Sequence, residues 1–522
     1  MIEEYYPACR SFLDHTTWKK ITALCADDTF VRTFPDTLLL RKGELGLPDF
    51  LPELARLESV LNHIKLTHTQ IPADVDSLTI NPTLQLLLLL YKNLLSLLKA
   101  ERDPSTVPEA GGDVILAWRH PTTGELWRRS ATQEDLLVLK MVAESIDPRH
   151  VSTTGNLPLA AVDAAIDRAA EQGLVLIPQS RIRRDPTFSP VTAATEPYLL
   201  ARSFTLQWHI TQACDLHCKH CYDRSKRSPL KLRQGLKILD DFYTFCRDRH
   251  VRGNVSFSGG NPLLYSHVLE LYQAAHERGF GTMVLGNPAP RKEMERLLSI
   301  QRPEYFQVSM EGLQEHNDAM RGPGHFRRVM EFLDLLRELR IYSMVMLTLT
   351  KENVRQVLPL AELLRGHADL FTFNRLSQVG EGAALQLPSR EEYAAFLEDY
   401  QDAANSNPVL GLKDNLLNVV LQKEGMELFG GCTGFGCGAA FNFMAVLPDG
   451  EAHACRKFPS PIGNVFRQSI AEVYDSSQAQ RYRSGSMACR SCPVHHVCGG
   501  CLAVTYSHGL DPCEARDPYC FA

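Results

Sequence analysis

Three cysteines stand close together near the middle of the chain, at Cys214, Cys218 and Cys221. Three thiolates on one short loop can bind three irons of a 4Fe-4S cube and leave the fourth iron without a protein ligand. A small molecule can coordinate that open iron. Zinc is the alternative metal, because His217 and His220 lie within the same run. Structural zinc sites commonly use four protein ligands, and only three cysteines are local here, so the pattern favours the cluster.

A second group of cysteines lies near the C-terminus, where nine of the 15 cysteines of the chain occur. The acidic N-terminus has no signal-peptide pattern, so we expect a cytoplasmic protein. In a reducing compartment, crowded cysteines indicate metal. A disulfide framework and two zinc-ribbon knuckles are the alternatives. The nine cysteines are Cys432, Cys437, Cys455, Cys489, Cys492, Cys498, Cys501, Cys513 and Cys520.

From Phe204 onward, short apolar or β-branched runs alternate with helical stretches of ten or more residues. This texture predicts parallel βα units in an α/β fold. Six strands are predicted, at 204–210, 254–258, 282–286, 305–310, 343–349 and 370–375. In a partial (β/α)6 barrel of the TIM-like kind, the carboxyl ends of these strands meet around one mouth. The first cysteine run follows the first strand, so we expect it at that mouth.

The run formed by Cys214, Cys218 and Cys221, followed by Tyr222, resembles the C-x3-C-x2-C motif of the radical S-adenosylmethionine (radical SAM) superfamily. The resemblance implies that the open iron binds the methionine amino and carboxylate groups of S-adenosylmethionine. It further implies that reduction of the cluster cleaves this cofactor to give a 5'-deoxyadenosyl radical. Such a radical removes hydrogen from an unactivated C–H bond.

The turn Gly259-Gly260-Asn261-Pro262 follows the second predicted strand and resembles the Gly-Gly-Glu-Pro turn of that superfamily. The resemblance implies that the glycines let the backbone approach the methionine end of the cofactor. In the family a carboxylate binds the ammonium group there. Asn261 departs from the pattern, because its amide oxygen accepts a hydrogen bond but carries no charge.

The fourth predicted strand ends at Ser309, and Glu311 and Arg321 follow it. This segment resembles the family's Ser-x-Asp/Glu-Gly stretch, which lies near the ribose and the methionine carboxylate of the cofactor. Ser309, Glu311 and Arg321 are therefore candidate cofactor contacts. Taken singly, each residue is better explained by a strand end followed by a charged, solvated helix, and only their order and co-occurrence favour the cofactor site.

The C-terminal cysteines resemble the SPASM domain of peptide-modifying radical enzymes, which binds two auxiliary 4Fe-4S clusters. The turn Leu447-Pro448-Asp449-Gly450 predicts a hairpin that brings Cys437 and Cys455 together. The resemblance implies one cluster on Cys432, Cys437, Cys455 and Cys501, and the other on Cys489, Cys492, Cys498 and Cys520. Cys513 is then left over.

The predicted domains are a helical region at 1–105, a winged-helix-like element at 112–187, the barrel at 200–405 and the SPASM domain at 430–522. In the first region we expect 84–98 to be a buried amphipathic helix. In the second, we expect a hairpin at 113–128, helices around 136–138 and up to 172, and a strand at 174–177. This order resembles the element with which peptide maturases hold leader peptides, although a purely structural winged helix fits equally well.

The composition favours a globular protein that acts on a small or peptide substrate. Hydrophobic residues make up 44% of the chain, and the net charge of −6 gives no general attraction to nucleic acid or to an acidic membrane. The apolar stretch at 84–98 is shorter than the roughly 20 residues that span a bilayer. We therefore expect neither nucleic acid nor membrane as a partner.

The whole layout resembles maturases of small ribosomally made peptides, a group that includes the selenobiotic-type maturases proposed to build thio- or selenoxazoles. The resemblance implies oxidation of a precursor peptide at or near cysteine residues, with electrons from a flavodoxin- or ferredoxin-type reductant. Anaerobic sulfatase maturases are the alternative, but they have an acidic residue as base where Arg456 follows Cys455. A metal-stabilised binding or electron-transfer protein is the alternative outside enzymes. The sequence identifies no catalytic acid or base.

Overall fold

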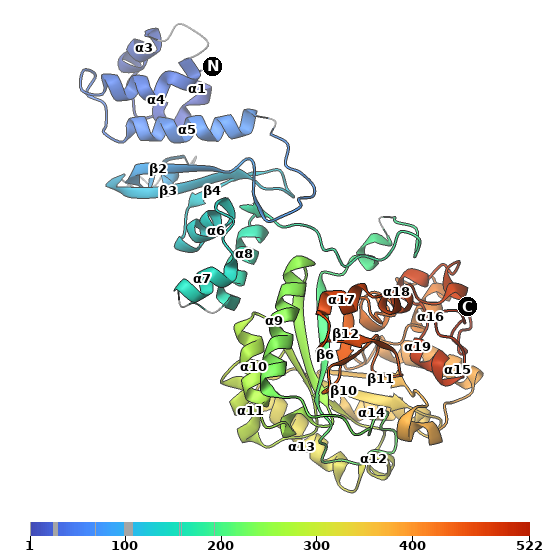
Figure 1. Cartoon of the computed structure of the whole chain (residues 1–522). Coiled ribbons are helices and arrows are strands. Elements are labelled where there is room, and N and C mark those ends of the chain that lie inside the picture. The colour runs from blue at the N-terminus through green and yellow to red at the C-terminus, as the bar shows by residue number, and fades with distance from the viewer. Residues whose placement is uncertain are drawn as a thin grey trace. The chain divides into compact units, whose positions relative to one another are not determined.

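The computed structural model describes residues 2–24, 30–67, 69–98, 108–155, 157, 159–192 and 194–522. The chain divides into two compact units, Met1–Gln179 and Ser180–Ala522 (Figure 1). We call them the first and second units. The four predicted domain ranges stay predictions.

In the first unit, helices pack on one face of a small antiparallel sheet. The helices are α1 (Ile2–Tyr5), α2 (Pro7–Arg10), α3 (His15–Ala23), α4 (Phe30–Arg41) and α5 (Leu51–Leu66). The sheet has the order β2-β3-β4, formed by β2 (Gln85–Lys92), β3 (Glu109–Arg119) and β4 (Leu126–Ser130). Buried leucines of α5 meet Leu87 and Leu89 of β2 and Ile115 of β3 in one hydrophobic core.

The predicted helix at 84–98 is wrong, because the segment forms strand β2 and then the 3-10 helix η1 (Leu94–Leu98). Leu87 and Leu89 are buried, whereas the leucines that alternate with them are exposed. An uninterrupted run of leucines shows neither a helical nor a strand period, so its pattern cannot separate the two structures. Pairing with β3 decides the outcome.

The predicted hairpin, helices and final strand of the first unit are confirmed. Strands β3 and β4 pair antiparallel, with Trp118 opposite Trp127. The elements that follow are α6 (Gln133–Ala143), α7 (Pro148–Gly155), α8 (Leu159–Glu171) and β5 (Val175–Leu176), which pairs with β1 (Thr79–Ile80). Helix α7 is an addition to the predicted elements. The assignment of this region as a winged-helix recognition element stays a prediction.

The six predicted strands of the second unit are confirmed, and they form one parallel sheet in the order β11-β10-β9-β8-β7-β6. They are β6 (Ser203–Thr211), β7 (Arg252–Gly259), β8 (Gly281–Leu285), β9 (Tyr305–Ser309), β10 (Ser343–Leu349) and β11 (Leu370–Arg375). The helices between them are α9 (Leu232–Asp248), α10 (Val268–Glu277), α11 (Arg291–Leu298), α12 (Gln314–Arg321), α13 (His325–Glu338) and α14 (Val357–Leu364). On the helix-covered face, Phe306 of β9 packs edge-on against Phe332 of α13, with ring centroids 5.0 Å apart. The fold is therefore the expected partial barrel.

The sheet continues past β6 into the C-terminal cysteine region, in the order β6-β12-β13-β14. The predicted turn at 447–450 is confirmed, because it joins β12 (Phe443–Val446) to the antiparallel β13 (Glu451–His453), which pairs with β14 (Pro461–Asn464). Strand β12 runs parallel to β6, with Val446 opposite Trp208. The cysteine region is thus bonded directly to the first barrel strand. The helices that follow β11 are α15 (Arg390–Ala404), α16 (Leu417–Lys423), α17 (Ile470–Asp475), α18 (Ser477–Arg483) and α19 (Leu502–Ser507).

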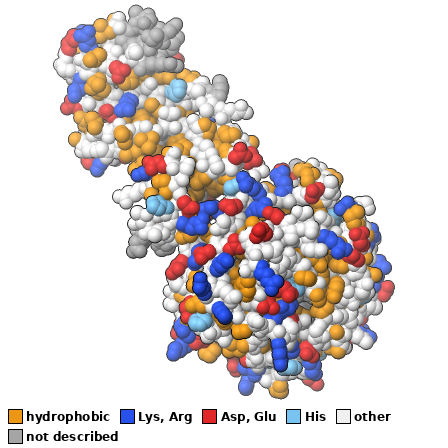
Figure 2. Space-filling model, viewed as in Figure 1, with side chains coloured by type: hydrophobic (Ala, Val, Ile, Leu, Met, Phe, Trp, Pro, Cys, Tyr) orange, Lys and Arg blue, Asp and Glu red, His pale blue; other side chains and the backbone are white. Residues whose placement is uncertain are grey.

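Acidic and basic side chains are interspersed on the face of the second unit that Figure 2 shows. Such mixing creates no large field of one sign on that face. In the described part of the chain, no helix combines the length and the apolar character needed to cross a membrane.

Candidate iron-sulfur and cofactor sites

The first cysteine loop leaves the end of β6 and is seated on the glycine turn that ends β7. Gly260 donates its amide to the carbonyl of Thr211, and Asn261 donates to that of Ala213 at 2.7 Å. A Cβ on Gly259 would lie 2.1 Å from the Thr211 carbonyl oxygen, and one on Gly260 would lie 2.2 Å from that of Ala213. The two glycines are therefore required for the loop that leads into the cysteine run to lie against β7.

A carboxylate stands beside this turn, although not at the position that the sequence pattern suggested. Asn261 and Asn287 donate their side-chain amides to the same Asp215 oxygen, Oδ1, at 3.0 and 2.6 Å. The Asn287 amide is also 3.7 Å from Cys214 Sγ. Asp215 is exposed. The sequence-based prediction missed Asp215. The signal that could have identified it is an acidic residue inside the cysteine run, combined with a glycine turn in which asparagine replaces the expected glutamate.

Arg321 connects the cysteine loop to a buried carboxylate. Its Nε and Nη2 donate to Glu311 Oε1 at 2.9 and 2.5 Å, and its Nη1 is 3.5 Å from Cys218 Sγ. Glu311 has no exposed surface, and its other oxygen accepts from the Thr348 amide at 2.8 Å. Burial alone would raise the pKa of Glu311, but His220 and Arg321 hold it below the usual value. Glu311 therefore reaches the site through Arg321.

The three thiols of the loop lie in one group with His220. Burial raises the pKa of Cys218, and the thiols of Cys214 and Cys221 are among the charges that act on it. His220 Nε2 lies 3.2 Å from both Arg321 Nη2 and Glu311 Oε1. Its Nδ1 is buried without a hydrogen-bond partner. Grouped thiols and an unsatisfied buried nitrogen fit an iron-sulfur cluster with a polar cofactor beside it.

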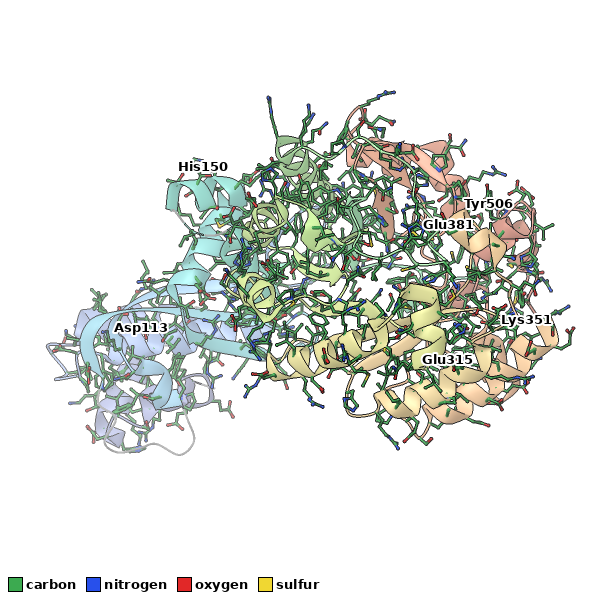
Figure 3. The ribbon with its side chains drawn as sticks, turned by 90° about the horizontal axis from the view of Figure 1, so that it is seen from below. Asp113, His150, Glu315, Lys351, Glu381 and Tyr506 are labelled. Carbon is green, nitrogen blue, oxygen red and sulfur yellow. The ribbon has the colours of Figure 1, made fainter. Side chains whose placement is uncertain are left out.

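Two further segments border this loop. Glu381, labelled in Figure 3, belongs to the turn η5 (Gly380–Ala384) and donates its amide to the Cys221 carbonyl at 2.9 Å. Ser309 ends β9 with its side chain on the face opposite Val308, because successive residues of a strand alternate between faces. Since Val308 is buried and Ser309 is partly exposed, Ser309 is available at the mouth of the barrel.

Four C-terminal thiols form what we call the first auxiliary set: Cys432, Cys437, Cys455 and Cys501. Burial raises the pKa of Cys437 to about 12, and the other three thiols add to the effect. Burial likewise raises the pKa of Cys455 to about 11. The structure therefore brings together the four residues that the resemblance assigns to one cluster.

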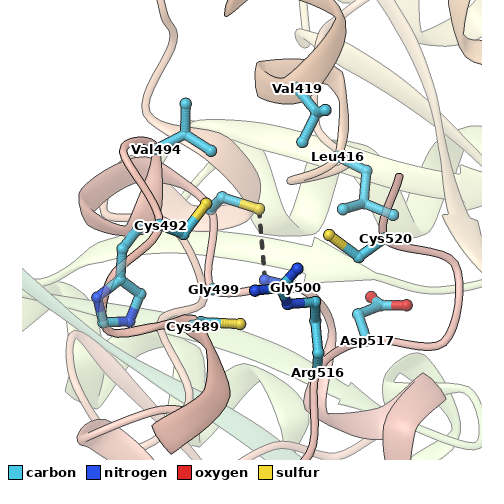
Figure 4. A pocket seen from close by; sticks show the side chains of 12 residues that line it. Leu416, Val419, Cys489, Cys492, Val494, Gly499, Gly500, Arg516, Asp517 and Cys520 are labelled. Carbon is cyan, nitrogen blue, oxygen red and sulfur yellow. Dashed lines mark hydrogen bonds between the residues drawn. The ribbon is translucent and has the colours of Figure 1, made fainter. Parts of the chain in front are cut away.

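Four other thiols, the second auxiliary set, line one pocket: Cys489, Cys492, Cys498 and Cys520 (Figure 4). The Gly500 amide donates to Cys498 Sγ at 3.4 Å, which is the dashed line in the figure. Cys513 is not among the residues that line the pocket. Burial raises its pKa to about 11, and the charges acting on it come from Arg481, Asp511 and Glu514. The structure groups Cys520, and not Cys513, with this set.

A buried arginine ties the second auxiliary set to the barrel. Arg375, the last residue of β11, donates to Asp414 at 2.8 Å and to both oxygens of Asp517 at 3.0 and 2.7 Å. Asp517 also accepts from the Cys501 amide at 2.8 Å. The charges of Asp414 and Asp517 act on Cys498. This buried triad thus fixes the backbone between the two auxiliary sets.

Arg456, which follows Cys455, forms a second link. It pairs with Asp223 of the first cysteine loop, and its guanidinium carbon lies 4.8 Å from the ring centroid of Tyr222. Its Nε is 3.4 Å from His209 Nδ1. A guanidinium stays protonated in proteins and accepts no proton. Arg456 therefore holds the cysteine loop against the C-terminal region and is unsuited to act as a base.

All cysteines of the described residues are free thiols. Among those residues, no three His, Cys, Asp or Glu side chains form a group that could hold a single metal ion.

Comparison with known proteins identifies two domains in the second unit. Residues 208–364 match the model of the radical SAM superfamily, and residues 437–501 match that of the SPASM iron-sulfur cluster-binding domain. The chain is 28% identical over 337 residues to mycofactocin maturase MftC of Mycolicibacterium smegmatis, covering 60% of this chain and 82% of that protein. It is 25% identical over 348 residues to the AdoMet-dependent heme synthase of Nitratidesulfovibrio vulgaris, covering 60% and 91%.

Among solved structures, Streptococcus suis SuiB bound to its precursor peptide SuiA superimposes with a TM-score of 0.50 at 18% identity. The match covers 78% of this chain and 96% of SuiB, and it supports the fold. The two family models imply 4Fe-4S clusters and S-adenosylmethionine as cofactors. The chain therefore contains a radical SAM domain at residues 208–364 and a SPASM iron-sulfur cluster-binding domain at residues 437–501.

Proposed function

We propose that this enzyme modifies a ribosomally made peptide, and that it does so oxidatively at or near cysteine residues. When bound, the reduced cluster and S-adenosylmethionine supply hydrogen-atom abstraction by a 5'-deoxyadenosyl radical. The observation that carries the proposal is the presence, in one compact unit, of a three-thiol loop and two four-thiol sets. The proposal agrees with the name of one relative by sequence, mycofactocin maturase MftC.

The proposed cluster ligands are the three loop cysteines and the two auxiliary sets. For the cofactor, we propose that Asp215 supplies the carboxylate that Asn261 lacks. Its Oδ1 is held by two amides, which leaves Oδ2 to accept from an ammonium group. Ser309 and Arg321 are the proposed contacts for the ribose and the methionine carboxylate. Gly259 and Gly260 keep the loop close enough for all of these groups to meet.

The auxiliary sets have two proposed roles. Oxidation of a substrate radical releases one electron, and a cluster near the barrel can accept it. Alternatively, a substrate thiol can replace one cysteine ligand and so anchor the peptide. The link from Arg456 to Asp223 keeps the first auxiliary set next to the cysteine loop, which favours a short path for the electron.

The winged-helix-like element at 112–187 is the proposed recognition element for the precursor peptide. Strand β4 lies at one edge of the sheet β2-β3-β4, and three helices follow it along the chain. The edge of a sheet can bind an extended peptide as an additional strand, through main-chain hydrogen bonds. SuiB, which shares the fold, was solved with a precursor peptide bound.

Two other activities are tested by the same experiment. Formylglycine formation of the sulfatase-maturase kind is disfavoured, because the position of the expected base is occupied by Arg456, which pairs with Asp223. A tetrapyrrole substrate is suggested by the names of the heme synthase relatives. A non-enzymatic metal protein predicts bound iron without cleavage of the cofactor.

The test is anaerobic reconstitution followed by dithionite and S-adenosylmethionine, with 5'-deoxyadenosine measured by chromatography. We expect about twelve irons per chain, from three four-iron clusters. Product should vanish in Cys218→Ala and persist in Cys246→Ala, which removes a buried cysteine outside all three sets. A flavodoxin- or ferredoxin-type protein should replace dithionite as the electron donor.

The substrate is tested with peptides encoded by neighbouring genes. A mass loss in such a peptide, located to residues at or beside cysteine, supports the proposal. Turnover of a porphyrin, or an intact cofactor despite full iron content, contradicts it.

A further inference from the structure

Four arginines are buried in the described part of the chain, and three of them are paired with carboxylates. The pairs are Arg321 with Glu311, Arg456 with Asp223, and Arg375 with Asp414 and Asp517. Arg184 is the fourth. The charged groups that act on it are Cys437, Tyr474 and Arg483, and none of these described residues is a carboxylate.

Arg184 is held by carbonyls and aromatic rings of the C-terminal region. Its Nη2 donates to the carbonyls of Phe435 and Cys437, at 3.1 and 2.6 Å. Its guanidinium lies between the rings of Phe188 and Phe441, 4.4 and 3.9 Å from their centroids. Only 4% of the residue is exposed, and its buried Nε has no hydrogen-bond partner.

This arrangement leaves a buried positive charge without a carboxylate partner among the described residues. Arginine stays protonated, and an uncompensated buried charge is costly. The positive charge of Arg483 increases this cost, although Arg184 Nη1 donates a hydrogen bond to the Arg483 carbonyl. Among the described residues no carboxylate balances Arg184, and the negative group placed to do so is the Cys437 thiolate with the cluster that it would bind.

Two lysines also lie beside cysteines of the first auxiliary set. Lys413 donates to the Cys432 carbonyl at 3.2 Å, and the charge of Lys457 lowers the pKa of Cys455 against the larger effect of burial. With Arg184 on the Cys437 carbonyl, three of the four cysteines of the first auxiliary set have a cation beside them. A four-iron cluster held by four thiolates is an anion, and one added electron makes it more negative.

We infer that Arg184 is the buried counter-ion of the cluster on the first auxiliary set, and that its charge favours the one-electron reduced state of that cluster. The inference rests on the ligand set of the proposed function. Arg184 contacts the cluster loop through the Cys437 carbonyl, so it is a positioning and charge-balancing residue. The second auxiliary set provides an internal reference, because the buried carboxylates that act on its Cys498, Asp414 and Asp517, are already paired with Arg375.

The test measures the reduction potentials of the auxiliary clusters. The full chain with Cys214, Cys218 and Cys221 replaced by alanine is reconstituted, so that the remaining iron belongs to the C-terminal cysteines. Dithionite titrations followed by electron paramagnetic resonance then compare Arg184→Met, Arg184→Lys and the parent protein. Arg183→Met is the matched control, since Arg183 is exposed and adjacent in sequence. Arg184→Gln is a second neutral variant, should the methionine variant not fold.

We expect one of the two potentials to shift to a more negative value in Arg184→Met, while the other stays in place. Both should stay in place in Arg184→Lys and Arg183→Met. Loss of one cluster in the neutral variants with retention in Arg184→Lys also supports the inference. Unchanged potentials at full iron content, or equal cluster loss in the lysine and neutral variants, overturns it. If the parent protein holds no C-terminal iron, the proposed ligand set itself fails.

Discussion

The two auxiliary sets consist of the same chemical groups, yet the charges buried around them differ. Beside the first set, Arg184 has no carboxylate partner among the described residues. The buried charges that act on Cys498 of the second set are Asp414 and Asp517, and both are paired with Arg375. Four cysteines therefore define a cluster position, whereas the surrounding charges define how readily that cluster takes up an electron. The predictions below test this difference, starting with the membership of the sets.

The largest effect is expected from removing a ligand of the second set. Cys520→Ala should lower the iron content by up to about four irons per chain, because the iron that loses its thiolate has mainly apolar residues of the pocket beside it and the cluster is held less tightly. Cys513→Ala is the matched control and should keep all of its iron, since Cys513 lies outside the pocket. Iron is counted after anaerobic reconstitution. Iron loss in Cys513→Ala but not in Cys520→Ala would show that Cys513, and not Cys520, is the fourth ligand of this cluster.

The balanced charge of the second set is tested by Arg375→Met. The substitution leaves two buried carboxylates without their cation, which typically costs about 3–5 kcal/mol. Urea unfolding followed by fluorescence should show a clearly lower midpoint at equal iron content. Arg365→Met removes an exposed arginine paired with Glu362 and should cost less than about 1 kcal/mol. Equal shifts in both variants would mean that the triad is not what holds β11 to the C-terminal segment.

Much of this architecture could be predicted from the sequence, because it depends on local signals. The six barrel strands, the turn at 447–450 and the cysteine spacings are each contained within a few residues. The helix predicted at 84–98 was wrong. Its leucines are not interrupted by polar residues at a regular spacing, and the strand forms by pairing with β3. The pairing of β12 with β6 and the bond between Arg375 and Asp517 also escaped prediction. Both join segments that lie far apart in the sequence.

The charged residues of the sites were the hardest part to predict. Arg184 stands in a polar stretch after the first unit, where nothing in the sequence indicates burial. Only the structure shows it between Phe188 and Phe441. Asp215 was visible inside the cysteine run, but its relation to Asn261 requires that the glycine turn and the loop be seen together.

Asp215 sharpens the comparison, because it is the opposite case to Arg184: an exposed carboxylate held by two amides and placed to receive a cation. Asp215→Asn should weaken binding of S-adenosylmethionine by roughly ten- to a hundredfold, the effect of losing one charged hydrogen bond. Binding is measured by anaerobic equilibrium dialysis at equal iron content.

Two further variants separate this role from a general effect of charge. Asp215→Asn combined with Asn261→Asp returns a carboxylate to the glycine turn and should restore part of the affinity. Glu315→Gln removes an exposed acid on α12 and should leave the affinity unchanged (Figure 3). An unchanged affinity in Asp215→Asn would reject Asp215 as the partner of the ammonium group.

The smallest effect is expected from Arg456→Met. Like Arg375→Met, this substitution removes a buried arginine that is paired with a carboxylate, but here the carboxylate, Asp223, keeps a second cation. Asp223 keeps Arg227, whose Nε lies 3.5 Å away, so the substitution should cost only about 1–2 kcal/mol in urea unfolding. The double variant with Arg227→Met should cost more than the sum of the single changes, because it leaves Asp223 without a cation. A cost as large as that of Arg375→Met would show that Arg456 is irreplaceable at the junction between the cysteine loop and Cys455. In that case the second cation beside Asp223, Arg227, would not compensate for the loss of Arg456.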